Sequence, residues 1–149
     1  MQVKLLSPTQ WASAKEKVTR FIYRNGDDRI TNAALVELRE LPAAQLASSR
    51  SGEAPAAIAL AISSSGKLAA CAFAAEGGER ACFVVVAPEF RGQGAGSALL
   101  KALSQRMGSL TCSVASDNPS SMAMCFRAGM KAVSLHDGPT GKPTLRFES

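Results

Sequence analysis

The sequence predicts one domain of mixed α/β class, with its elements in the order β-α-α-β-β-β-α-β-α-β-β. Its 149 residues suit one domain and are too few for two. Hydrophobic residues make up 46% of the chain and charged residues 19%, which is typical of a globular protein. Helical periodicity alternates with short apolar runs that end in turn residues, and this alternation predicts the order of elements.

The chain is expected to open with a strand over residues 2–6 and then a helix. Ser7 suits the N-cap of that helix, Pro8 its first position, and Gln10 can complete a capping box. Apolar residues follow at helical spacing as far as Gly26, a plausible helix stop.

A second helix is predicted over residues 32–41, because Pro42 ends its apolar periodicity. Residues 43–55 are rich in Ala, Ser and Gly and are expected to form a mobile connection. Three apolar runs separated by turn residues then predict strands over residues 57–62, 68–75 and 80–87.

The second half of the chain is predicted to begin with a glycine-rich loop that leads into a helix ending near Met107. Asn118 and Pro119 suit the N-cap and first position of a further short helix, which stops at Gly129. The remaining apolar runs predict strands over residues 110–115, 131–136 and 144–147.

The segment from Val84 to Ser97 carries the clearest chemical signal. An apolar strand stops at Pro88, and three glycines at alternate positions, Gly92, Gly94 and Gly96, then precede a helix. Glycines let the backbone approach a ligand closely, and the start of a helix offers unpaired N–H groups and the positive end of its dipole. This arrangement predicts a cradle for an anion such as a diphosphate.

Two common phosphate-binding motifs fit this segment poorly. A P-loop requires Lys followed by Ser or Thr after its last glycine, and that pair is missing here. A dinucleotide fingerprint requires Gly or Ala where Ser97 stands, and it should open a βαβ unit, whereas the strands before this loop are predicted to form hairpins.

The pattern that does fit is [QR]-x-x-G-x-[GA], met by Arg91, Gly94 and Gly96. The stretch Val-x-Pro-x-x-Arg-Gly-x-Gly-x-Gly and the later segment from Asn118 to Gly129 resemble the GNAT acetyltransferase superfamily. The resemblance implies one domain over residues 1–149 with a central mixed, mostly antiparallel sheet and helices on both faces. It also implies a cofactor cleft where strands 80–87 and 110–115 splay apart.

The resemblance implies an acetyl-CoA-dependent N-acetyltransferase in which a small-molecule or peptide amine attacks the thioester directly in a ternary complex. The alternative is an inactive or weakly active module that senses acyl-CoA. The amide of Val86 would polarise the thioester carbonyl, and Arg91 would act mainly through its own amide. The expected cofactor-binding residues are Val85, Val86, Arg91, Gly92, Gln93, Gly94, Ala95, Gly96, Ser97 and Asn118.

The proton donor departs from the family pattern, because Cys125 stands where many members carry a tyrosine. Its thiol could protonate the departing thiolate, since the two have similar acidity. Alternatively, Cys125 packs in the core, as free cysteines often do. Glu79 and His136 are weak candidates for the general base. Asn118 could steady the cofactor or simply cap its helix.

Composition sets further expectations. Four cysteines without a CxxC pair and one histidine leave too few ligands for a zinc site, so no metal is expected, and a reducing cytoplasm is the favoured location. The charge is +5, but basic residues are scattered singly, so nucleic-acid binding is disfavoured. No apolar run reaches the ~20 residues of a membrane span. Small domains of this family often pair through their late strands, so a homodimer is an expectation by analogy.

Overall fold

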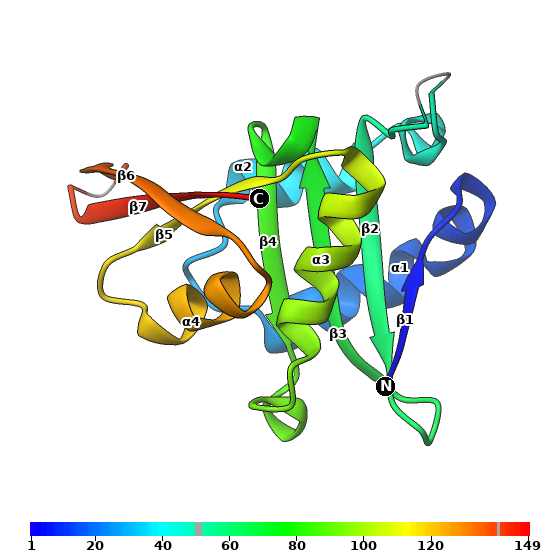
Figure 1. The fold of residues 1–149 in the computed structure, drawn as a ribbon. Coiled ribbons are helices and arrows are strands. Elements are labelled where there is room, and N and C mark those ends of the chain that lie inside the picture. The colour runs from blue at the N-terminus through cyan, green and yellow to red at the C-terminus, as the bar shows by residue number, and fades with distance from the viewer. Residues whose placement is uncertain (50–51, 140) are drawn as a thin grey trace.

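The computed structural model describes residues 1–49, 52–139 and 141–149. Figure 1 shows α3 crossing one face of a sheet while α1 and α2 cover the other, with a second, smaller sheet beside β4. The helices are α1 (Pro8–Asn25), α2 (Asn32–Arg39), α3 (Ala95–Met107) and α4 (Pro119–Arg127), with short 3₁₀ turns η1 (Ala43–Leu46), η2 (Glu76–Gly78) and η3 (Pro88–Phe90). The strands are β1 (Gln2–Leu5), β2 (Ala56–Ile62), β3 (Leu68–Ala75), β4 (Ala81–Val86), β5 (Thr111–Ala115), β6 (Lys131–Asp137) and β7 (Pro143–Glu148).

The strands form two sheets. The first has the order β1-β2-β3-β4 and the second the order β5-β7-β6, and every pair of neighbours is antiparallel. Among the described residues no ladder joins β4 to β5. The predicted fold class is confirmed, with its central sheet divided between these two strands.

The core follows the side-chain alternation of β2 and β3. Large residues such as Ile58 and Phe73 share one buried cluster with Trp11 of α1 and Leu38 of α2. The alternate positions are alanines, among them Ala59 and Ala72, and the leucines of α3 pack on them. This flat alanine surface lets α3 lie close to the sheet, which fixes the glycine loop at its N-terminus against the end of β4.

The η2 turn, which precedes β4, holds the two sheets together. Gly78 lies so close to the backbone of Thr111 that a Cβ there would overlap the Thr111 carbonyl oxygen. Nearby, Arg146 of β7 forms an ion pair with Glu79. Farther along the chain, the last residues of β4 line a pocket instead of meeting β5. The two strands therefore meet at their starts and separate toward their ends.

One predicted segment differs from the structure. Residues 43–55 are expected to be mobile, yet η1 is an ordered turn whose Leu46 is buried in the core. Arg106 of α3 donates to the Leu46 carbonyl at 3.1 Å, and the Ala54 amide donates to the Arg106 carbonyl at 3.2 Å. A single buried leucine and these bonds order both ends of the segment, and residues 50–51 lie outside the described part of the chain.

Strand β6 forms the outer edge of the second sheet, and all of its residues are exposed, Val133 and Leu135 included. Pairing of two copies through the late strands stays a prediction. Within the described residues, none of the helices combines the length and the apolar character needed to cross a bilayer.

Candidate functional site

The glycine loop presents unpaired backbone donors. Gly94 is the N-cap of α3, and no side chain caps the helix there. Its carbonyl accepts the first helical bond, from the Ala98 amide at 3.1 Å. Within the described part of the chain, the N–H groups of residues 94–97 donate to no protein acceptor. A helix start in this condition attracts an anion.

The space in front of the loop is open. Gly92 and Gly94 have left-handed φ angles of +77° and +82°, and a Cβ on either would meet no atom within 4 Å. Gly96 has a different reason to be glycine, because a Cβ there would overlap the sulfur of Met124 on α4. The first two glycines therefore keep the loop open to a ligand, whereas Gly96 lets α4 pack against α3.

The end of β4 has a free backbone edge. The Ala87 amide donates to the Ala69 carbonyl of the β3 side at 2.9 Å. Because strand residues alternate, the N–H and C=O groups of Val84 and Val86 point the other way, toward the pocket. The Val86 carbonyl accepts from Nε of Arg91 at 3.3 Å. The backbone of Val85 faces β3, so only its neighbours can bind a ligand through the backbone.

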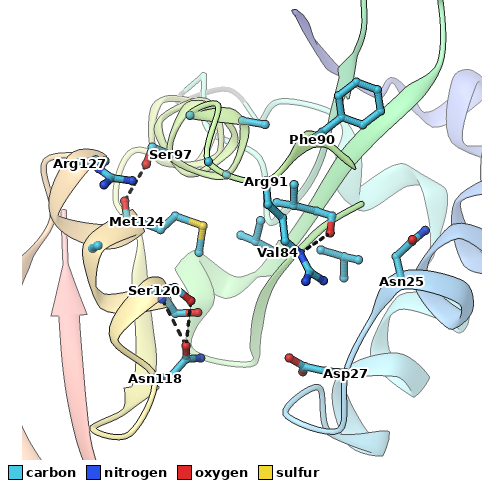
Figure 2. Close-up of a pocket in the computed structure, with 18 of the residues that line it drawn as sticks. Asn25, Asp27, Val84, Phe90, Arg91, Ser97, Asn118, Ser120, Met124 and Arg127 are labelled. Atoms are coloured by element: carbon cyan, nitrogen blue, oxygen red, sulfur yellow. Dashed lines mark hydrogen bonds between the residues drawn. The ribbon is translucent and has the colours of Figure 1, made fainter. Parts of the chain in front are cut away.

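Helix α4 supplies the facing wall. Oδ1 of Asn118 accepts from the Ser121 amide at 3.3 Å, so Asn118 caps the helix while also lining the pocket. Ser97 donates through Oγ to the Met124 carbonyl at 2.9 Å, which joins α3 to α4 (Figure 2). The Ser97 side chain is thus engaged in packing, and its amide is the group left for a ligand.

These walls and the α1–α2 loop enclose a pocket of about 410 Å³. Nine of the expected cofactor-binding residues line it: Val85, Val86, Arg91, Gly92, Gly94, Ala95, Gly96, Ser97 and Asn118. Gln93 does not, and its side chain donates to the Glu89 carbonyl at 3.4 Å. Further lining residues that the motif did not indicate are Asn25, Gly26, Asp27, Ile30, Val84, Phe90, Ser120, Ser121, Ala123, Met124 and Arg127.

The amide of Arg91, expected to face the ligand, donates instead to the Pro88 carbonyl at 3.4 Å within η3. Its side chain reaches the pocket, where Figure 2 shows it between α4 and the α1–α2 loop. Arg91 and Arg127 thus place positive charge in the pocket that the glycine loop lines.

Cys125 is buried and is absent from the residues that line the pocket. Its Sγ lies 3.5 Å from Sγ of Cys112 on β5. The hydrogen bond with Cys112 and burial together raise the pKa of the Cys125 thiol above its ordinary value. Both the position and the direction of this pKa shift favour the packing interpretation of Cys125.

The candidate bases also lie elsewhere. Glu79 pairs with Arg146, whose hydrogen bond lowers the pKa of the Glu79 carboxyl, and neither Glu79 nor His136 lines the pocket. In the described ranges, no group of three or more His, Cys, Asp or Glu side chains is placed to hold a metal ion.

Comparison with known proteins gives a family match. The model described as "Acetyltransferase (GNAT) family" matches residues 28–130. Among solved structures, a variant of spermidine N-acetyltransferase SpeG from Vibrio cholerae has a TM-score of 0.64 at 14% identity, covering 99% of this chain and 94% of that chain. Aminoglycoside acetyltransferase AAC(6')-Ib in complex with coenzyme A and kanamycin has a TM-score of 0.58 at 14% identity, covering 99% of this chain and 93% of that chain. Among curated proteins there is no significant match.

Proposed function

Because the chain belongs to the acetyltransferase (GNAT) family, we propose that it is an acetyl-CoA-dependent N-acetyltransferase whose acceptor is an amine. The observation that carries this proposal is the row of unpaired N–H groups at residues 94–97, four residues that all line the pocket. Hydrogen bonds to a charged oxygen contribute roughly 1.5–3 kcal/mol each, so a few of these amides suffice to anchor a diphosphate. Arg91 and Arg127 add positive charge nearby.

The free edge of β4 suits the amide-containing arm of the cofactor. An extended ligand can bind such an edge as an added strand, through the outward groups of Val84 and Val86. The Val86 N–H is then the group that polarises the thioester carbonyl and stabilises the charge that develops on its oxygen. Val85, which was expected to bind the cofactor, can do so only through its side chain, since its backbone faces β3.

Acetyl-CoA supplies the acetyl group as a thioester. The acceptor nitrogen, in its neutral form, attacks the thioester carbonyl carbon, and the carbon–sulfur bond breaks as the amide bond forms. The nitrogen releases one proton, and the departing CoA thiolate takes up one proton from solvent. Holding both reactants in one pocket makes this step effectively unimolecular.

The test is release of free CoA thiol from acetyl-CoA in the presence of amines, measured with and without the protein. The panel should include spermidine, for which one structural neighbour is named, and kanamycin, which is bound in the other. Simple amines and peptides complete the panel. We expect amine-dependent thiol release. Binding of acetyl-CoA without release for any amine would instead identify an acyl-CoA sensor, and absence of binding would reject the site.

Replacing Cys125 by Ala separates packing from acid catalysis. We expect turnover at saturating substrate to stay within about two-fold of the wild type, because the thiol does not line the pocket. Loss of a buried sulfur should lower the free energy of unfolding by about 0.5–1.5 kcal/mol, as removal of one core atom does. Steady-state kinetics and urea unfolding measure the two effects. A large fall in kcat with unchanged stability would restore the acid role.

A further inference from the structure

Charge is divided between the walls of the pocket. Three ionisable side chains line it among the described residues: Arg91, Arg127 and Asp27. Arg91 stands beside the glycine loop, and Arg127 lies at the end of α4. Asp27 comes from the α1–α2 loop on the other side, and Figure 2 shows its carboxylate pointing into the space opposite Asn118. The pocket therefore has a cationic side and one anionic group facing it.

The carboxylate of Asp27 is oriented without being neutralised. Oδ1 accepts from the Arg29 backbone amide at 2.9 Å, which fixes the side chain within its loop. No cationic side chain of the described residues forms an ion pair with it. The nearby cations are engaged elsewhere, because Arg29 and Lys142 both bind the carboxylate of Asp117, at 3.1 and 2.9 Å. Asp27 thus keeps its charge available to a ligand.

We infer that Asp27 binds a second, positively charged amino group of the acceptor, so that the preferred acceptors are diamines or polyamines. This inference rests on the proposed acetyl transfer in the same pocket. The attacking nitrogen must be neutral, whereas an alkyl amine with a pKa near ~10 stays protonated at neutral pH. One molecule meets both needs when it carries two amino groups, because Asp27 holds the charged one while the other faces the thioester.

The position of Arg91 supports the same orientation. Its guanidinium lies on the side of the pocket where β4 ends, so it repels a fixed ammonium from that side. An ammonium is therefore directed toward Asp27, and the nitrogen that enters beside Val86 is the one that can lose its proton most readily. A simple monoamine gains nothing from the carboxylate.

The experiment compares α,ω-diamines of three to eight carbons with monoalkylamines of the same chain lengths, using acetyl-CoA and the thiol-release assay. We expect kcat/KM for the best diamine to exceed kcat/KM for its matched monoamine about ten-fold or more. Two equivalent amino groups on one molecule would by themselves give only a two-fold difference. Asp27→Asn should raise KM for that diamine about 3- to 5-fold, because it removes a charge pair made by an exposed carboxylate. Its effect on the monoamine should be under two-fold.

The substitution keeps the loop intact, since the amide oxygen of Asn can still accept from Arg29. Asp28→Asn removes the same charge one residue away, outside the pocket lining, and should leave both amines unaffected. Equal kcat/KM for a diamine and its matched monoamine overturns the inference, and so does an equal fall of kcat for both amines in Asp27→Asn. In either case, amine-dependent turnover still supports the proposed acetyl transfer. Absence of thiol release with every amine overturns the proposed function itself.

Discussion

Replacing Gly94 by Asp is expected to abolish measurable acetyl-CoA binding while leaving the fold in place. The carboxylate would stand at the start of α3, where the N–H groups of residues 94–97 have no partner among the described residues. It would bond to those groups itself and repel the diphosphate. Losing two bonds to charged oxygens costs roughly 3–6 kcal/mol, which corresponds to at least ~100-fold in dissociation constant. Isothermal titration calorimetry with acetyl-CoA measures the loss.

A matched control separates charge at the site from backbone strain. Gly66, in the β2–β3 hairpin, has the same φ of +82° and the same open surroundings as Gly94. Gly66→Asp should therefore lose a similar ~1 kcal/mol of stability from the left-handed conformation and retain wild-type affinity. Gly94→Ala adds no charge and should weaken binding far less than Gly94→Asp. Wild-type affinity in Gly94→Asp would show that the diphosphate binds elsewhere.

The sequence predicted the features that depend on local order. Ser7 and Gln10 form the expected capping box at the start of α1, and Asn118 caps α4 as expected. Each of these signals depends on residues within a few positions of one another, so composition and spacing suffice to read it. The glycine loop is a signal of the same local kind, because the unpaired N–H groups belong to consecutive residues; diphosphate binding there stays a prediction.

Features that depend on distant contacts could not be predicted in the same way. Asp27 lines the pocket because the α1–α2 loop folds back to the end of β4, and no motif singles out this carboxylate from the other charged residues of its segment. Cys125 stands at the position of the family's tyrosine, yet its side chain turns toward Cys112 on β5. The choice between Val85 and Val86 depends on the register of β4 against β3, which one bond from Ala87 to Ala69 settles. The burial of Leu46 could not be predicted, because a single buried residue in an Ala-rich stretch creates no hydrophobic periodicity.

Replacing Gly78 by Ala is expected to lower the free energy of unfolding by about 2–4 kcal/mol. Two costs add at this position. The φ of +92° disfavours any L side chain, and the added Cβ would overlap the backbone of Thr111 at the start of β5. Backbone atoms of a strand cannot turn aside as a flexible side chain can. Relief therefore requires the η2 turn and the second sheet to move apart.

Gly66→Ala is the matched control for this change, because it carries a similar φ of +82° and meets nothing within 4 Å. It should cost only the conformational part, about 1 kcal/mol. The difference between the two variants in urea unfolding then measures how tightly the sheets are held where η2 meets the start of β5. Since the last residues of β4 line the pocket proposed for the cofactor, Gly78→Ala should also weaken acetyl-CoA binding, whereas Gly66→Ala should not. Equal stability of the two variants would mean that the close approach of Gly78 to Thr111 does not set the spacing of the sheets.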